Sequence, residues 1–347
     1  MQRKITILAG YVAAMMAAAG ARADVPQVTV DIAPVQSLAA RVMAGLGEPA
    51  LVVRPGASPH GFSMRPSEAA ALQRAEVVFF VSGRLTPWFE EALEPLAGKA
   101  QIVELLEAEG SVRHNFRDAV VFGEDGHDHE HEEGEAHGDE HGDEHEEGHD
   151  EDHGHEDEQA HAGESDHDDD HGHAHVGVDP HGWLDPENGK VWLGVMAETL
   201  AEKDPDNAAA YRANAVAGQA EIDAAVAKAE ALLAPVRDRA FVAQHDAYQY
   251  FEHRFGLQVA GAISLGDAVQ PGPRRIAELR EALKARDVVC VFSEPQFNPG
   301  LIATVFDGSD VRVAELDPLG VGLPRGAALY PALIERVAKD VASCLGE

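Results

Sequence analysis

Short apolar runs rich in Val, Ile and Phe alternate along this chain with stretches in which apolar residues recur at helical spacing. Strands that alternate with helices are typical of parallel βα units. The pattern therefore predicts an α/β fold with two βα lobes, each built on a parallel sheet. The expected strands are 28–32, 51–53, 77–81 and 101–103 in the first lobe, and 240–243, 258–263, 288–292 and 311–316 in the second. The expected helices are 35–44, 67–74, 247–255, 274–285, 299–306 and 330–345.

A long helix with one narrow apolar stripe is expected between the lobes. It begins at Asp204 and Pro205, because Asp can cap a helix and Pro suits its first turn. At 1.5 Å per residue it would be about 43 Å long. We interpret it as a rod that runs along both lobes and limits how far they hinge; an ordinary helix packed inside one domain is the alternative. The stripe consists of Tyr211, Ala215, Gly218, Ile222, Val226, Ala229 and Leu233.

The first residues have the pattern of a secretory signal peptide. Arg3 and Lys4 precede the apolar stretch 5–19 and the small-residue triplet 21–23, which predicts cleavage after Ala23 and a soluble mature chain. An uncleaved membrane anchor is the alternative, but it needs ~20 apolar residues and this stretch is shorter. The expected organisation is a signal peptide at 1–23, an N-terminal lobe at 24–203, a linking helix at 204–235 and a C-terminal lobe at 236–347.

Most of the formal net charge of −34 comes from residues 124–175, which hold 24 acidic residues and no Lys or Arg. The acidic character of the chain argues against a nucleic-acid partner and favours cations as ligands. Because this stretch has almost no large apolar residue, we expect a disordered loop inserted near the end of the first lobe. Its histidines are His127, His129, His131, His137, His141, His145, His149, His153, His155, His161, His167, His171, His173 and His175.

The chain has two cysteines, Cys290 and Cys344. Disulfides persist in the oxidising compartments that receive exported proteins, so we expect the two to pair. Closing the loop between them would stabilise the fold by roughly 4 kcal/mol in the chain-entropy model. Two free buried thiols are the alternative.

Three of the five histidines outside the loop lie in distinctive local sequences. His60 follows an expected strand in R-P-G-A-S-P-H-G-F, His181 lies in D-P-H-G-W-L-D-P, and His245 lies in F-V-A-Q-H-D-A-Y directly after a strand. Ligand sites of open α/β sheets form at the carboxyl ends of strands, where the first and third of these residues lie. Three neutral imidazoles around a divalent ion are a well-attested ligand set for zinc. A hydrogen-bonded structural role is the alternative for each histidine taken singly. His114 and His253 lack such settings, and we assign them no role.

Taken together, the motifs along the chain resemble those of a known family, the zinc-specific binding proteins of bacterial ABC importers of the ZnuA type. The resemblance covers essentially the whole mature chain, and its motifs occur in order: G-A-S-P-H-G-F, M-R-P-S-E, D-P-H-G-W-L-D-P, H-D-A-Y-Q-Y-F-E, V-F-S-E-P-Q-F and L-D-P-L-G. It implies that His60, His181 and His245 bind Zn²⁺ and that Cys290 and Cys344 pair. It also implies a periplasmic protein that delivers the metal to the membrane permease of an ABC transporter. We expect it to act as a monomer.

The fourth zinc ligand is where the resemblance is least informative. Some zinc receptors have a carboxylate immediately before the first histidine, but here that residue is Pro59, which cannot coordinate. Asp317 in L-D-P-L-G matches an aspartate that completes the site in manganese-binding and some zinc-binding relatives. Water is the other candidate, and Asp317 can equally cap a turn before Pro318. Glu294, which follows an expected strand, is expected to support the site without binding the metal.

Other functions compete with zinc capture and delivery. A manganese or iron receptor typically offers two histidines and two carboxylates, a harder ligand set than three histidines. A zinc hydrolase or lyase needs a positioned base, and no H-E-x-x-H motif occurs in the chain outside the acidic loop 124–175. A secreted zinc buffer without a transporter is a third alternative. For the loop 124–175, we expect weak auxiliary zinc binding or sensing, with a purely solvated charged insertion as the alternative.

Overall fold

The computed structural model describes residues 25–117, 177–264, 286–297 and 311–346, with a few single residues between 272 and 306. It confirms the expected α/β fold, because two four-stranded parallel sheets form, with strand orders β2-β1-β3-β4 and β6-β5-β7-β8. The first sheet contains β1 (Val28–Val30), β2 (Ala50–Leu51), β3 (Val77–Phe80) and β4 (Gln101–Glu104). The second contains β5 (Ala240–His245), β6 (Gln258–Ser264), β7 (Cys290–Ser293) and β8 (Arg312–Glu315).

Prolines mark the beginnings of most helices in the first lobe, where a missing N–H costs nothing and the fixed φ suits the helix. The sequence pattern missed α3, which begins at Pro87 and also holds Pro95 in its interior. The helices expected at 274–285 and 299–306 lie largely outside the described residues. The helices of the first lobe are α1 (Ala33–Val42), α2 (Pro66–Arg74), α3 (Pro87–Ala97) and α4 (Pro186–Lys203), and those of the second are α6 (Gln249–Phe255) and α9 (Leu329–Gly346).

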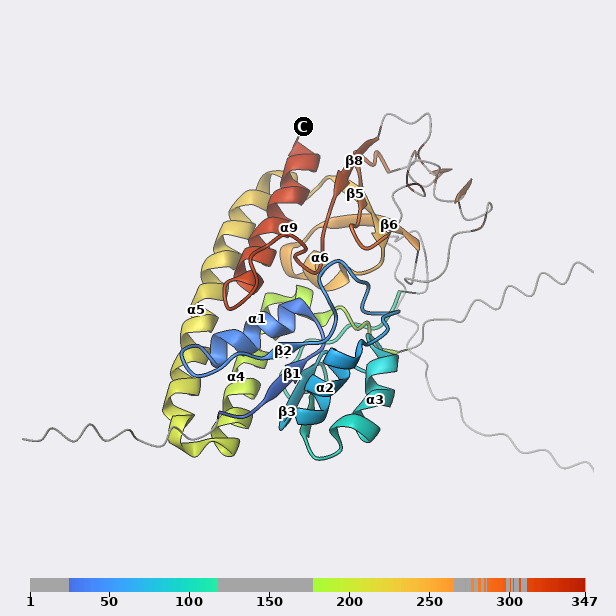
Figure 1. The fold of residues 1–347 in the computed structure, drawn as a ribbon. Coiled ribbons are helices and arrows are strands. Elements are labelled where there is room, and N and C mark those ends of the chain that lie inside the picture. Colours follow the sequence, from blue (N-terminus) through green and yellow to red (C-terminus); the bar gives the residue numbers. More distant parts are fainter. Residues whose placement is uncertain are drawn as a thin grey trace, which may run out of the picture. The chain divides into compact units, whose positions relative to one another are not determined.

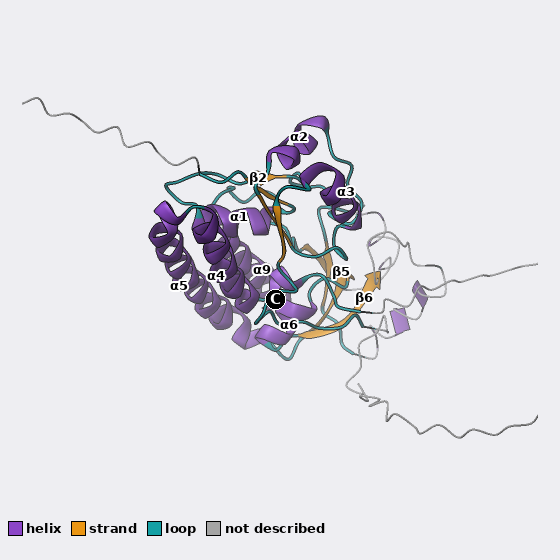
Figure 2. Cartoon of the chain, turned by 90° about the horizontal axis from the view of Figure 1, so that it is seen from below, coloured by secondary structure: helices purple, strands orange, loops and turns teal. Residues whose placement is uncertain are grey.

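The long helix is present as α5 (Ala208–Leu233), about 39 Å in length. Short 3₁₀ turns precede and follow it at Pro205–Asn207 and Ala234–Val236, so the regular helix begins later than the sequence indicates. It packs against α1 and α4 of the first lobe and against α9 of the second (Figures 1 and 2). The stripe expected from the sequence is buried in full, together with Ala225. A helix shared by both lobes is therefore confirmed, while its effect on hinging stays a prediction.

One hydrophobic core extends through both lobes. The same cluster of buried side chains includes Val30 of β1, Leu193 of α4, Phe241 of β5 and Leu333 of α9. A smaller cluster containing Val242 packs separately in the second lobe. The first sheet and the second are thus joined by continuous apolar packing through the helices between them.

The expected disulfide is also present. Cys290 of β7 bonds to Cys344 of α9, with the two Cα atoms 6.1 Å apart and a sequence separation of 54. Both side chains are buried in the shared core. The bond therefore holds the last helix against the second sheet.

The predicted signal peptide and the histidine-rich loop 124–175 lie outside the described residues. Across the described part of the chain, no helix combines the length and the apolar character needed to cross a membrane. The domain boundaries proposed from the sequence stay predictions.

The contact between α4 and α9 gives a test of this packing. A Cβ atom on Gly189 of α4 would lie 2.5 Å from the ring and hydroxyl of Tyr330 on α9. We expect Gly189→Ala to lower the free energy of unfolding by about 1–3 kcal/mol through overpacking, as measured by urea denaturation. A Cβ atom on Gly194 of the same helix would meet no neighbouring element within 4 Å. Gly194→Ala should therefore raise the free energy of unfolding by about 0.5–1 kcal/mol, because Ala loses less conformational freedom on folding than Gly. Equal effects at the two positions would contradict this account of the interface.

Candidate metal centre

His60 lies on an irregular loop between β2 and α2. Gly56 has a φ of +82°, a left-handed conformation that favours glycine and allows the chain to turn here. The indole Nε1 of Trp88 on α3 donates to the carbonyl oxygen of Pro59 at 2.7 Å, and the rings of Trp88 and Phe62 lie 5.3 Å apart. An aromatic side chain of α3 therefore anchors the loop that carries His60.

His181 lies in a tight turn that leads into α4. Its backbone N–H donates to Oδ1 of Asp179 at 3.0 Å, and its ring Nδ1 lies 2.6 Å from the same oxygen. A 3₁₀ turn at Gly182–Leu184 follows, and the Asp185 carboxylate caps α4 by accepting from the backbone N–H of Glu187 at 2.9 Å. Asp185 thus defines the start of α4, and the turn before it fixes the direction of the His181 ring.

His245 is the last residue of β5, which extends two residues beyond the strand expected at 240–243. Its Nδ1 lies 2.6 Å from Oε1 of Glu294, which follows β7, the neighbouring strand. The backbone N–H of Glu294 in turn donates to Oε1 of Gln244 at 2.7 Å. Two adjacent parallel strands therefore end in a histidine and the carboxylate that orients it.

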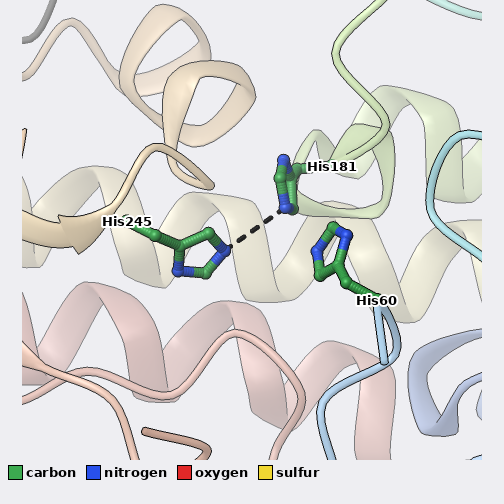
Figure 3. A group of neighbouring side chains, drawn as sticks. All are labelled: His60, His181 and His245. Carbon is green, nitrogen blue, oxygen red and sulfur yellow. Dashed lines mark hydrogen bonds between the residues drawn. The ribbon is translucent and has the colours of Figure 1, made fainter. Parts of the chain in front are cut away.

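The three imidazoles converge from three separate parts of the chain, and Figure 3 shows their rings directed toward one another. One ring nitrogen of each lies within 4.8 Å of those of the other two. The Nε2 atoms of His181 and His245 are 3.3 Å apart. A tetrahedral zinc ion, at ~2.0–2.1 Å from each nitrogen, separates two of its ligand nitrogens by about 3.3–3.4 Å. The spacing of this pair fits such an ion.

Burial keeps these rings in the form that binds metals. His181 and His245 are each 4% exposed, and His60 is half-buried. Burial, followed by the charges of the neighbouring histidines, holds the pKa of His60 well below 6.5, and burial together with His245 does the same for the pKa of His181. Neutral imidazole has a free lone pair, so these two side chains can coordinate a cation throughout the neutral pH range.

Buried carboxylates select which nitrogen faces the centre. A carboxylate beside Nδ1 favours the tautomer with its hydrogen on that atom, which leaves the Nε2 lone pair for a metal. Asp179 does this for His181, and Glu294 does it for His245. Burial raises the pKa of Asp179 to about 7 and also raises the pKa of Glu294. The support expected from Glu294 is seen here, whereas sequence reasoning missed Asp179, whose only signal was the D-P-H motif.

The cavity at the centre is small. It is lined by the three histidines together with apolar groups that include Trp183, Phe297 and Leu319. Its volume of about 10 Å³ is close to that needed for one water molecule. The arrangement suits a single ion, since an organic substrate would need a larger space.

Asp317 is not a member of the metal-binding cluster that the described residues form, which consists of His60, His181 and His245. Its Oδ1 accepts from the side-chain amide of Gln296 at 3.0 Å and from the backbone N–H of Leu319 at 2.9 Å, and its Oδ2 accepts from the backbone N–H of Val321. The carboxylate therefore stabilises the turn that follows it, one of the two roles left open by the sequence. Its role as a fourth ligand stays a prediction.

His114 and His253 also lie apart from the three converging rings. They contact each other instead, with ring centroids 4.4 Å apart and ring planes inclined by 21°. His114 lies on the segment that follows β4, and His253 lies on α6. Sequence reasoning gave no reason to expect this contact.

Comparison with known proteins agrees with this site. The family model described as "Zinc-uptake complex component A periplasmic" matches residues 28–344. The High-affinity zinc uptake system protein ZnuA of Paracoccus denitrificans (strain Pd 1222) is 43% identical over 331 residues, which cover 95% of each chain. The protein of the same name from Brucella suis biovar 1 (strain 1330) is 40% identical over 320 residues, which cover 92% of each chain. This chain belongs to the ZnuA family of periplasmic zinc-uptake components.

Solved structures show the same architecture. A crystal structure of ZnuA superimposes with a TM-score of 0.67 at 22% sequence identity, covering 92% of this chain and 99% of that one. At this identity the likeness concerns the fold alone. It confirms the two-lobed fold with parallel sheets that the sequence predicted.

The carboxylate beside His245 gives a test of the site. We expect Glu294→Gln to weaken zinc binding about 10–100-fold, because a neutral amide orients Nδ1–H and polarises the ring less well than a carboxylate. Competition with a chromophoric chelator would measure the change. The same substitution at Glu315, whose side chain is exposed on β8, is the matched control and should leave affinity unchanged. Equal affinities for the Glu294 variant and the original protein would show that this contact does not tune the metal ligand.

Proposed function

We propose that this protein captures Zn²⁺ in the periplasm with His60, His181 and His245 and delivers it to the membrane permease of an ABC importer. The observation that carries the proposal is the convergence of three imidazole nitrogens within 4.8 Å, with one pair at the spacing of a tetrahedral zinc site. The names of the relatives, High-affinity zinc uptake system protein ZnuA, support zinc as the cargo and uptake as the purpose.

Water is the fourth ligand in this proposal. The carboxylate of Asp317 already accepts from one side-chain amide and two backbone N–H groups, so binding a metal would require it to give up partners in its turn. A cavity of about 10 Å³ beside the histidines has room for a single water. An exchangeable fourth position also suits a carrier, because a carrier must release its cargo.

The protein acts as a carrier rather than a catalyst in this proposal. The two carboxylates nearest the centre, Asp179 and Glu294, face the Nδ1 atoms of the ligand rings and are thereby engaged in orienting them. A zinc hydrolase or lyase would need a base directed at a bound substrate. Three imidazoles without a carboxylate ligand also favour zinc over manganese or iron.

Further parts of the proposal rest on the sequence. Cleavage after Ala23 releases a soluble mature chain into the periplasm, where the disulfide between Cys290 and Cys344 forms. The protein works as a monomer without nucleic acid. The histidines and acids of residues 124–175 bind additional zinc weakly.

Replacing each ligand singly tests the assignment. We expect His60→Ala, His181→Ala and His245→Ala to abolish the tight site, with affinity falling at least about 100-fold, because each removes one of three protein ligands. Zinc competition with a chromophoric chelator measures this. His114→Ala and His253→Ala are the controls and should retain the tight site. If tight binding survives any of the first three substitutions, the corresponding ligand is wrongly assigned.

The dependence of zinc affinity on pH follows from the lowered pKa values of His60 and His181. Protons compete with zinc for imidazole, and for His60 and His181 they do so only well below pH 6.5. We expect the affinity of the tight site to fall most steeply below pH 6.5, with a smaller decline between pH 8 and 6.5 as Asp179, whose pKa is about 7, takes up its proton, as measured by competition titrations at each pH. A loss of affinity that is complete by pH 6.5 would contradict the assigned protonation states of His60 and His181.

A further inference from the structure

The contact between His114 and His253 brings together two metal-binding side chains that the zinc centre does not use. Their rings are nearly parallel, at 21°, with centroids 4.4 Å apart. His114 is half-buried and His253 is exposed, so ions in solution can reach the pair. The two residues come from different lobes, one from the segment after β4 and the other from α6.

The backbone holds both residues in place. The carbonyl oxygen of His114 accepts from the backbone N–H of Asp179 at 2.8 Å, and its N–H donates to the hydroxyl of Tyr250 at 3.1 Å. The adjacent residue Asn115 forms an antiparallel bridge with Val178. His253 is carried by a regular helix, α6. The pair is therefore built on fixed backbone, although its rings can still rotate.

Both rings are in a form that can bind a cation. Burial, followed by the neighbouring His253, lowers the pKa of His114, and burial, followed by Arg117, lowers the pKa of His253. The positive charge of Arg117 would oppose a cation nearby, but its guanidinium forms ion pairs with Glu252 and, at 3.6 Å, with Asp246. The two imidazoles are thus neutral at neutral pH, and the charge of Arg117 is balanced by two carboxylates.

The separation of the rings also fits a shared ion. A metal lies ~2.1 Å from a ring nitrogen, which places it roughly 3.2 Å from the ring centroid, so two rings at a right angle about the metal have centroids about 4.5 Å apart. A tetrahedral angle increases that separation to about 5.2 Å. The observed 4.4 Å is close to the first value, and the three rings of the main centre are 5.1, 5.3 and 6.2 Å apart. The two rings are stacked, so binding requires one of them to turn out of the stack until a nitrogen of each ring is directed at the ion.

We propose that His114 and His253 form a second site for a divalent transition metal of the zinc class, with water at the remaining positions. With two protein ligands in place of three, and with one ligand exposed, this site is weaker than the tight centre and exchanges its ion faster. A metal here would connect the two lobes at a point separate from the tight centre. The inference goes beyond the proposed function, because it concerns side chains that have no part in the three-histidine site.

Residue-resolved chemical modification tests the second site in the full-length protein. Diethyl pyrocarbonate reacts with free imidazole, and mass spectrometry of proteolytic fragments reports each histidine separately. With increasing Zn²⁺ beyond one equivalent, we expect the modification rate of the exposed His253 to fall at least five-fold. Mg²⁺, which prefers oxygen ligands, should leave the rate unchanged.

The variant His114→Gln shows whether the protection of His253 requires a shared ion. We expect zinc to change the rate at His253 less than two-fold in this variant, while the half-buried His60 is still protected by the first equivalent, which shows that the tight site is intact. The reciprocal variant His253→Gln should remove any protection of His114. Two outcomes overturn the proposal: His253 stays reactive at high zinc in the original protein, or its protection is complete at one equivalent and persists in His114→Gln. Failure of the first equivalent to protect His60 in the original protein would instead count against the tight centre.

Discussion

The packing of α5 against helices of both lobes is the constraint on which the metal centre depends. His60 and His181 belong to the first lobe and His245 to the second, so their nitrogens can converge only if the lobes keep a fixed relation. A single apolar stripe on α5 buries side chains against α4 and α9 together. Apolar packing far from the metal thus determines the separations between the ligand nitrogens. A shift of about 1 Å in these separations would disrupt coordination.

The three ligand histidines are held in different ways. Buried carboxylates orient His181 and His245, and each of these contacts is short, at 2.6 Å. Keeping a carboxylate buried is costly, which is seen in the raised pKa values of Asp179 and Glu294, and a bound cation would offset that cost. His60 lies on a loop that is held by Trp88, whose indole N–H donates to the carbonyl oxygen of Pro59. Two ligands are therefore oriented by buried carboxylates, and the loop of the third is held by Trp88.

Much of this could be predicted from the sequence, since strand and helix periodicity reflects burial directly. Alternating patterns located both sheets and the stripe of α5, and the motifs around His60, His181 and His245 indicated the residues that converge. Periodicity did not reveal α3, because Pro95 in its interior argues against a helix whose stability comes from packing. The contacts of Asp179 with His181 and of His114 with His253 depend on side-chain direction and on pairing across lobes, which spacing along the chain does not report.

The continuous core has a thermodynamic consequence. Because one cluster of buried side chains contains residues of both sheets, unfolding of one lobe would remove apolar contacts of the other, and the described fold should unfold as one cooperative unit. A ligand that binds only the folded state adds its binding free energy to that whole unit. A zinc ion held at the junction would therefore protect the entire fold from unfolding, so the loaded and empty forms of the carrier would differ in lifetime as well as in cargo.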